Sequence, residues 1–564
     1  MLKITSKKKG NYDPLRGSRF VWTAVVGICV VVYMIQLHQF LAKWQTIPSL
    51  DDAYVFCRYA DHLLSGWGLA WNPGGPQTFG CTSLLYTFWI AALRFLTDLP
   101  CWKVLSLGSW IPALAAVFVT GFACMRVASL PALRHPAVGI GFVCLCTCLQ
   151  QAFFFHAKSG MDTTTAILAN ALLVLVVVDP QLVQSNWRVV LAGFAAYLTF
   201  LARPDNLLYA TLFPGILLFA AARGGSRRRR LAVLFVVVFG ALLLVDGVVK
   251  TVVFGNPLPL PYYAKAGSFY EGYIGNLLWN PIRYARFFVI NQMLPVLIMI
   301  LAVSRRSWRL VVAVMIPCVL TFGYYGTVTQ IMGFKARFYY PAMPFLIVAA
   351  YHALDTRVAL FREGRLRFCF RRLAVRLVML GACAVLTLPL AGKGAEWYEE
   401  RCRRLFYTNI LRSDLYEPAQ TAPRLGWSPS MNAVGRMVLY CPAQVVWAMS
   451  EHGIISASAP NVTIIDLAGL HDRNTLSGKS TIDHMFERKP DVIWFPHSDY
   501  TGMVNAIQTH VLFAEEYDYW PGAFDYGLAV RRDTPYKSEI GRALRETWRM
   551  YYRIECPPPS IRIR

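Results

Sequence analysis

Two adjacent aspartates, Asp51 and Asp52, are the residues with the clearest capacity for chemistry in this chain. They follow the first apolar segment, which runs from about 20 to 42. Acidic side chains at the edge of a membrane segment are costly unless they bind or react with something. A carboxylate in such a place can act as a general base toward a hydroxyl group. The alternative is a water-facing turn that holds two acids, and spacing alone favours neither interpretation.

Charged residues of several later segments could act together with this pair. Arginine can hold a phosphate through two parallel hydrogen bonds, and lysine can hold it as a point charge. A carboxylate beside such cations would activate a hydroxyl group and stabilise a departing phosphate. The candidate substrate-binding residues are Arg58, His156, Asp162, Arg203, Asp205, Tyr263, Lys265, Lys335 and Arg337.

Each of these candidates also has a structural interpretation. Asp162 could cap the N-terminus of the helix that follows it. Arg203 and Asp205 could form a local ion pair in a tight turn. The loop from 257 to 265 and the basic pair within 335–337 could be anchors at the membrane interface, where aromatic and basic side chains are common. The sequence leaves both interpretations open for each segment.

The aromatic residues are weaker evidence for sugar binding, and motifs for nucleotide binding are absent. Trp67, Trp71 and Phe79 could stack on sugar rings, although aromatic residues are also frequent at membrane interfaces. The sequence contains no P-loop, no dinucleotide-binding fingerprint and no zinc motif. A nucleotide-sugar donor and ATP-driven transport therefore have no recognisable site.

The composition predicts a polytopic membrane protein. Of 564 residues, 56% are hydrophobic and 16% are charged, whereas soluble domains carry about 25% charged residues. The net charge of +24 could suggest a nucleic-acid partner. The arginines, however, cluster between apolar segments, where the positive-inside rule places them, and we therefore predict no nucleic-acid partner. We expect the apolar segment after the basic N-terminus to be a membrane anchor rather than a cleaved signal peptide.

The arginine pattern predicts the topology of the apolar segments. If the segment at 80–98 does not cross the membrane, Arg126 and the later basic clusters all fall on the cytoplasmic side. Arg94 and Asp98 within that segment are typical of a helix that lies at the membrane interface. We thus expect an α-helical protein with about eleven spans, a cytoplasmic N-terminus and the candidate residues on one outer face. The twelve apolar segments are 20–42, 80–98, 103–125, 137–155, 163–178, 187–202, 206–222, 231–254, 284–304, 310–331, 338–354 and 375–391.

Two domains are expected, with the boundary near residue 391. Residues 1–391 form the transmembrane domain, whose first extracytoplasmic loop covers about 43–102, and residues 392–564 form an extracytoplasmic α/β domain. Strand-like runs in the second domain lie at 437–440, 462–470, 491–495 and 526–532, with helical stretches such as 501–516 between them. The basic run from Ser538 to Arg564 is expected to be solvated or to lie against lipid headgroups.

The cysteines show no metal-ligand spacing. Cys57 and Cys81 could form a disulfide if the first loop is extracytoplasmic. Cys144, Cys146 and Cys148 lie within an apolar segment, where packing is the expected role.

Taken in order, six segments resemble a known family. The chain is similar to membrane glycosyltransferases of the GT-C class that use polyprenyl-phosphate sugars, and within that class to the terminal β-1,2-arabinofuranosyltransferases of mycobacterial cell walls. Flagellar motor-control proteins of the ZomB type share the same pattern. The segments are DDAYVFCRYADHLLSGWGLAWNPGG from residue 51, SGMDT at 159–163, RPDNLL at 203–208, LPLPYYAKAG at 258–267, ARFYYPAMPFL at 336–346 and IDLAGLHD at 465–472.

The resemblance implies a reaction and a location. A sugar, arabinofuranose in the nearest relatives, would pass from a polyprenyl-phosphate donor to a cell-envelope glycan on the outer face of the cytoplasmic (inner) membrane. Asp51 and Asp52 would serve as catalytic base or as ligands of a metal or the acceptor, so a divalent cation stays open and no other cofactor is implied. The family often has Glu where this chain has Asp162 and Asp205, which keeps the charge but changes its reach.

Two other functions stay open. One is a non-enzymatic membrane protein of the same fold, acting in flagellar motor control or envelope assembly. The other is a transporter, although the apolar segments show no inverted repeat of the kind that transporters often contain.

Overall fold

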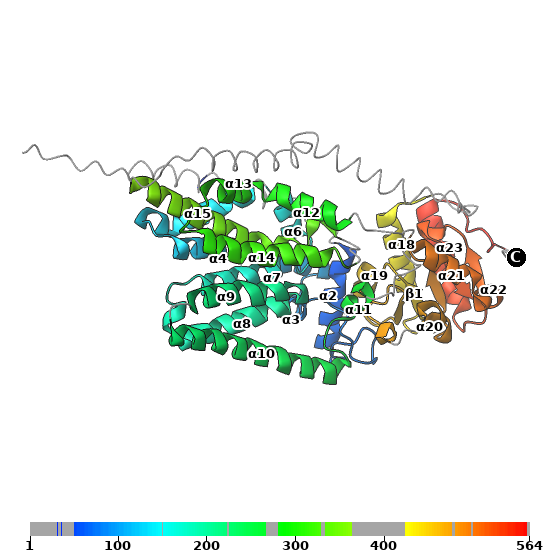
Figure 1. The fold of residues 1–564 in the computed structure, drawn as a ribbon. Coiled ribbons are helices and arrows are strands. Elements are labelled where there is room, and N and C mark those ends of the chain that lie inside the picture. Colours follow the sequence, from blue (N-terminus) through cyan, green and yellow to red (C-terminus); the bar gives the residue numbers. More distant parts are fainter. Residues whose placement is uncertain are drawn as a thin grey trace, which may run out of the picture.

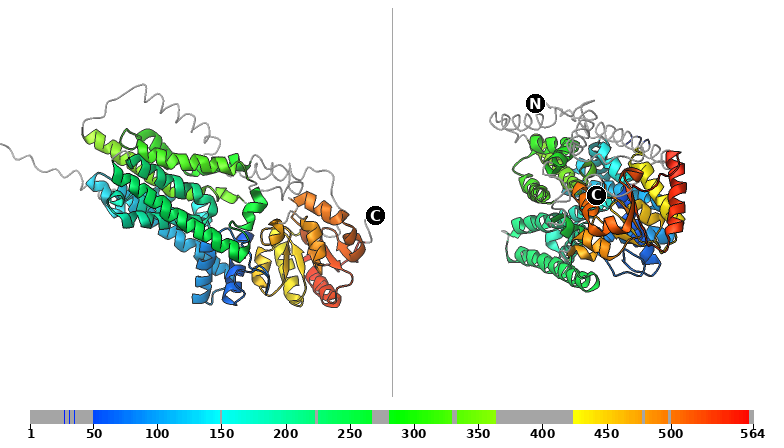
Figure 2. Two further views of the ribbon diagram at one scale, coloured as in Figure 1. Left: turned by 60° about the horizontal axis from the view of Figure 1, so that its bottom comes forward. Right: turned by 90° about the vertical axis from the view of Figure 1, so that its right-hand side faces the viewer.

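The computed structural model describes residues 50–148, 150–222, 225–266, 280–328, 333–363, 424–476, 480–497 and 500–560, together with the isolated positions 27, 31 and 35. A bundle of helices forms one end of the molecule, and a small sheet covered by helices forms the other (Figure 1). The two parts meet at α2 (Asp51–Leu64) and α11 (Leu260–Ala266). The left view of Figure 2 shows the same arrangement from another side.

Every apolar segment of the sequence that falls within the described residues forms helix. Several segments are broken: 137–155 becomes α5 and α6, and 284–304 becomes α12 and α13. The helices of the bundle are α3 (Leu84–Leu96), α4 (Cys101–Val127), α5 (Pro136–Cys148), α6 (Gln151–Lys158), α7 (Thr163–Val177), α8 (Asn186–Ala202), α9 (Leu207–Ala222), α10 (Ser226–Phe254), α12 (Asn280–Asn291), α13 (Met293–Ala302), α14 (Trp308–Tyr325) and α15 (Met343–Arg362).

The number of helices that can cross a membrane is smaller than predicted. Four helical stretches among the described residues are long and apolar enough, and the count rises to six if each of two bent helix pairs is one span. Helices α7, α8 and α9 have 15, 17 and 16 residues, fewer than the roughly 20 that a straight span needs. Eleven spans are therefore too many for the described residues. The predicted segment at 375–391 lies outside them, as does the segment at 20–42 apart from the isolated positions 27, 31 and 35.

The exposed surface of the bundle fits a membrane protein. In α10, only 17% of the apolar span is buried within the molecule. Val237, Leu244 and Val252 of this helix are 59%, 69% and 79% exposed. Water would make such a continuous apolar surface unfavourable, whereas lipid accepts it.

The C-terminal part is an α/β unit, as predicted. Its sheet has the order β2-β1-β3-β5-β4. Strand β1 runs parallel to β2 and β3, and the remaining neighbours are antiparallel. The strands are β1 (Trp447–Met449), β2 (Ile464–Asp466), β3 (Val492–Trp494), β4 (Tyr517–Trp520) and β5 (Leu528–Arg531), and the helices are α18 (Trp427–Tyr440), α19 (Gly453–Ser458), α20 (Thr481–Glu487), α21 (Thr501–Thr509), α22 (Val511–Glu516) and α23 (Lys537–Tyr552).

Some local predictions in this unit are wrong. The run at 437–440 ends helix α18 instead of forming a strand, because its apolar residues continue a helical pattern that buries Val434, Met437 and Val438. The basic run from Ser538 includes α23, whose Leu544 and Trp548 are buried. The part of the run up to Tyr552 is thus an amphipathic helix packed on its own domain. The predicted domain boundary near 391 lies outside the described residues.

Candidate functional site

A cavity lies where α2 and α11 of the first part meet the C-terminal unit. It offers about 80 Å³ to the centres of water-sized molecules, which is room for several waters or a small polar group. Both parts of the chain contribute acidic, basic and histidine side chains to the wall of this cavity. These residues are Asp51, Asp52, Lys265, Arg337, Glu451, His452 and His471.

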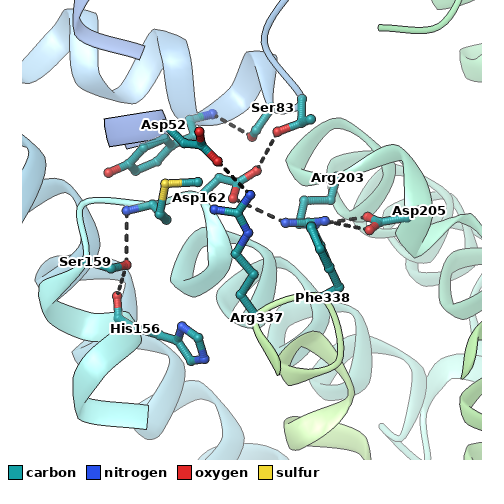
Figure 3. A network of polar contacts seen from close by, with 12 residues as sticks. Asp52, Ser83, His156, Ser159, Asp162, Arg203, Asp205, Arg337 and Phe338 are labelled. Atoms are coloured by element: carbon teal, nitrogen blue, oxygen red, sulfur yellow. Dashed lines mark hydrogen bonds and ion pairs between the residues drawn. The ribbon is translucent and has the colours of Figure 1, made fainter. Parts of the chain in front are cut away.

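Asp52 and Arg337 form the central ion pair of the cavity. Nη2 of Arg337 donates to Oδ2 of Asp52 over 2.9 Å, although 285 residues separate the two in sequence (Figure 3). Burial disfavours the charged form of Asp52, but the positive charges of Arg337 and Lys265 outweigh it and hold the pKa of the carboxyl group below its ordinary value. Asp52 is therefore ionised at neutral pH.

Arg337 keeps unused donors at this site. Its side chain is only 6% exposed. Within the described part of the chain, Nε and Nη1 have no hydrogen-bond partner. Buried guanidinium donors without partners are costly. An anion bound at either group would satisfy that donor through a charge-assisted hydrogen bond.

Lys265 adds a second cation at the end of α11. The backbone N–H of Leu260, at the start of this helix, donates to the carbonyl of Phe79 over 2.7 Å, which ties α11 to the first loop. Burial, and after it the nearby charge of Arg337, lower the pKa of Lys265 to about 8. Lys265 is thus mostly protonated at neutral pH.

The ring of Phe338 lies among three cations. The guanidinium carbons of Arg203 and Arg337 are each 5.0 Å from its centroid, and Nζ of Lys265 is 5.7 Å away. An aromatic face attracts cations at such distances. Phe338 thus helps to hold like charges near one another before any anion binds (Figure 3).

Arg203, Asp205 and Asp162 form a buried network beside the cavity. Arg203 donates to both carboxylate oxygens of Asp205, at 3.0 and 2.6 Å, and to Oδ1 of Asp162 at 3.3 Å. Thr82 donates to the other oxygen of Asp162 over 3.0 Å. Asp162 stands at the N-cap position of α7 without a side-chain capping bond. Only Thr82 of these residues lines the cavity, so the network supports its wall from behind.

Asp51 has a different environment from its neighbour. Its two oxygens accept the backbone N–H groups of Gly453 and Ile454, at 2.9 and 2.7 Å, at the start of α19. A Cβ on Gly453 would lie 2.0 Å from the carbonyl oxygen of Asp51, so only glycine permits this approach. Burial outweighs these hydrogen bonds and raises the pKa of Asp51. The carboxylate joins the two parts of the molecule, and its oxygens are already occupied.

Arg58, predicted to bind substrate, also lies in the contact between the two parts. It is fully buried. Its guanidinium donates to the carbonyls of Trp71, Ser456 and Val462 at 2.7, 2.9 and 2.7 Å, with longer or side-chain contacts to Ala459 and Asn72. It does not line the cavity. Arg58 is therefore a residue of the contact between the two parts and not of the cavity wall.

Three further candidates lie outside the cavity wall. His156 is buried, and its Nε2 is 3.0 Å from the carbonyl oxygen of Lys335. The ammonium group of Lys335 lies 5.7 Å from the ring of Phe287. Tyr263 is half-buried on α11 and packs edge-on against Tyr262. Of the nine predicted substrate-binding residues, only Lys265 and Arg337 line the cavity.

The aromatic residues of the first loop are packed rather than open to a sugar. Trp71 is 3% exposed, and its ring stacks on that of His471 with centroids 4.0 Å apart. Phe79 is 1% exposed and stacks on Phe254. Trp67 packs edge-on against His62. Stacking on sugar by Trp71 or Phe79 would require the core of this region to open.

Cys57 forms a disulfide with Cys101, not with Cys81. The bond joins α2 to the start of α4. Cys81 is buried, and its sulfur accepts a hydrogen bond from the hydroxyl of Thr87. The predicted pairing of Cys57 with Cys81 is therefore wrong, because the cysteine that the fold brings next to Cys57 is Cys101, at the start of α4.

The C-terminal unit supplies cavity residues that sequence reasoning missed. Glu451 and His452 follow β1, and His471 follows β2. Side chains that follow neighbouring parallel strands meet at one edge of the sheet. His471 lies within IDLAGLHD, a segment already noted for its resemblance, so a signal for this residue existed.

Neither a scan against protein-family models nor a search of curated proteins finds a match for this chain. The geometry itself offers an ionised carboxylate, two cations with capacity for an anion and a cavity between two parts of the chain. Such a set can remove a proton from a hydroxyl group and bind a phosphate.

Proposed function

We propose that the protein is an integral-membrane glycosyltransferase of the GT-C type. It moves a sugar, arabinofuranose by resemblance, from a polyprenyl-phosphate donor to a cell-envelope glycan. The observation that carries the proposal is the Asp52–Arg337 pair, with Lys265, in the wall of one cavity. A carboxylate and two cations in that place match the base and the leaving-group site of such a reaction.

The reaction needs one bond to form and one to break. The acceptor hydroxyl oxygen attacks the anomeric carbon of the donor sugar, and its proton passes to Asp52. The bond between that carbon and the phosphate oxygen breaks, and polyprenyl phosphate leaves with the electron pair. Arg337 and Lys265 stabilise the charge that develops on the phosphate.

Donor binding would also adjust the base. In the structure, Arg337 is hydrogen-bonded to Asp52 and lowers its pKa. A donor phosphate that accepts a hydrogen bond from Nε or Nη1 of Arg337 places negative charge beside this cation and offsets its effect on Asp52. The pKa of Asp52 then rises toward its ordinary value, and the carboxylate becomes a stronger base once the substrate is present.

The location follows from the resemblance and has independent support. We place the cavity on the outer face of the cytoplasmic membrane, with the N-terminus in the cytoplasm and the C-terminal unit outside. The Cys57–Cys101 disulfide supports this orientation, because such bonds persist in oxidising compartments. The exposed apolar surface of α10 supports lateral access of a lipid-linked donor from the bilayer.

The pH dependence of the reaction gives a prediction for Lys265. Its pKa is lowered to about 8, so the ammonium form is present below that pH and is lost above it. We expect kcat/KM for the donor to fall as pH rises through about 8, because this parameter reports the free enzyme. In Lys265→Arg the group stays protonated throughout, and the alkaline fall should disappear. Equal alkaline falls in both proteins would remove Lys265 from donor binding.

A deletion strain tests the function in cells. The proposal predicts that deletion removes terminal sugars, arabinofuranose among them, from a surface glycan. Wild-type protein should restore the glycan, whereas Asp52→Asn should not, at equal abundance in the membrane. Loss of motility with an unchanged glycan would contradict the proposal and favour the non-enzymatic alternative.

A further inference from the structure

Two histidines of the C-terminal unit present unpartnered nitrogens at the cavity. His452 and His471 are 4% and 3% exposed and line its wall. Within the described ranges, Nδ1 of His452 and Nε2 of His471 have no hydrogen-bond partner. A buried ring nitrogen without a partner is costly. Two such nitrogens in the wall of one cavity indicate a ligand that bonds to both of them.

The opposite nitrogen of each ring is held by a hydrogen bond. Nε2 of His452 lies 2.9 Å from Oδ1 of Asp466, and Nδ1 of His471 lies 3.2 Å from the hydroxyl of Tyr59. Metal-binding histidines have this arrangement, in which one ring nitrogen donates to an oxygen and the other binds the ion. In the tautomer that carries its proton on the nitrogen facing Asp466 or Tyr59, the outward nitrogen of each ring has a lone pair that can coordinate an ion.

Asp466 fixes both histidines at once. Besides His452, its carboxylate accepts the backbone N–H groups of Ala468, Leu470 and His471 at 2.8, 2.6 and 2.8 Å. Each oxygen thus already accepts two hydrogen bonds. Asp466 consequently serves as the partner that positions the ligands, and it needs no direct bond to an ion.

The two rings also have suitable spacing. Their centroids are 5.1 Å apart, with 71° between the ring planes. One ligand atom from each of His452, Asp466 and His471 can be chosen so that all three lie within 4.8 Å of one another. Two nitrogens that bind one zinc ion at about 2.0–2.1 Å are at most roughly 4 Å apart. The two histidines thus belong to one group of buried side chains close enough together to hold a metal ion.

We propose that His452 and His471 bind one divalent transition-metal ion in the wall of the cavity. Two imidazoles favour zinc and similar ions over magnesium or calcium. Glu451 lines the same cavity and offers a carboxylate as a third ligand. His452 and His471 line the same cavity as Lys265 and Arg337, where the donor phosphate is proposed to bind. The proposal of a metal site does not depend on the transfer reaction.

Zinc binding to the full-length, detergent-purified protein tests this site. After treatment with a chelator, the protein is titrated with Zn²⁺ by calorimetry. We expect one tight site per chain, and at least a 100-fold weaker affinity in His452→Ala and in His471→Ala. His484→Ala and His510→Ala are matched controls in the same unit, since both rings are only partly buried and neither lines the cavity. They should bind zinc as the wild type does.

X-ray absorption at the zinc edge of the wild-type complex gives a second measurement that does not depend on how the variants fold. We expect two imidazole nitrogens at about 2.0–2.1 Å together with oxygen ligands. Absence of a tight site in the wild type, or a bound zinc ion without two imidazoles, would overturn the proposal. Either result leaves the transfer reaction intact, because Asp52, Arg337 and Lys265 act without the ion.

Discussion

Asp52→Asn is expected to lower the rate of sugar transfer about 100- to 10,000-fold, the range that a positioned general base contributes. Asparagine keeps the size of the side chain but cannot accept the proton of the acceptor hydroxyl. The side chain of Asp52 is 32% exposed, and among the described residues its ion pair is with Arg337. The fold should therefore survive, and thermal unfolding should change little. The measurement is initial transfer rate by purified protein at saturating donor.

Substitutions of two other aspartates serve as comparisons for Asp52→Asn. Asp98→Asn changes an exposed carboxylate beyond the end of α3 and should leave the rate unchanged. Asp51→Asn should act mainly on stability, because both oxygens of Asp51 accept backbone N–H groups from α19. If Asp52→Asn keeps the wild-type rate while Asp51→Asn folds normally and loses activity, the roles assigned to the pair are reversed.

Arg58→Ala is expected to have the largest effect on the stability of the contact between the two parts of the molecule. The guanidinium is fully buried and donates to three backbone carbonyls at 2.7–2.9 Å, two of them in the C-terminal unit. Its removal leaves these acceptors without partners in the interior. We expect a loss on the order of 3–5 kcal/mol, as when one member of a buried charged network is removed.

Limited proteolysis and thermal unfolding measure this loss. In Arg58→Ala, cleavage near α19 should become much faster, and unfolding should occur at a lower temperature. Arg542→Ala removes an arginine from the exposed side of α23 and should match the wild type in both measurements. Wild-type resistance to protease in Arg58→Ala would show that the contact does not depend on this side chain.

The meeting of distant charges at one end of the bundle could be predicted from sequence. The positive-inside rule places alternate loops on one side of a membrane, so the segments that contain Asp52, Arg203 and Arg337 were expected to share a face. The structure brings these residues together, through the Asp52–Arg337 bond and the ring of Phe338. Which of these residues line a cavity depends on the directions of their side chains. The hydrophobic pattern of the sequence does not predict those directions.

The difference between Asp51 and Asp52 could not be predicted. The two residues are adjacent and chemically identical, and their roles are set by partners 402 and 285 residues away. The same limit applies to Arg58, whose acceptors belong to the contact with the C-terminal unit. The number of spans was overestimated for another reason. Hydropathy does not report where a helix ends, and α7, α8 and α9 have only 15, 17 and 16 residues.

The most direct test of the account is transfer by the purified protein. Full-length protein in lipid nanodiscs is given polyprenyl-phosphate arabinofuranose with a labelled sugar, together with an arabinan acceptor. The account predicts labelled glycan and free polyprenyl phosphate in equal amounts from the wild type, and almost none from Asp52→Asn. A wild-type protein that binds the donor but forms no labelled glycan, or an Asp52→Asn protein that forms as much as the wild type, would contradict it.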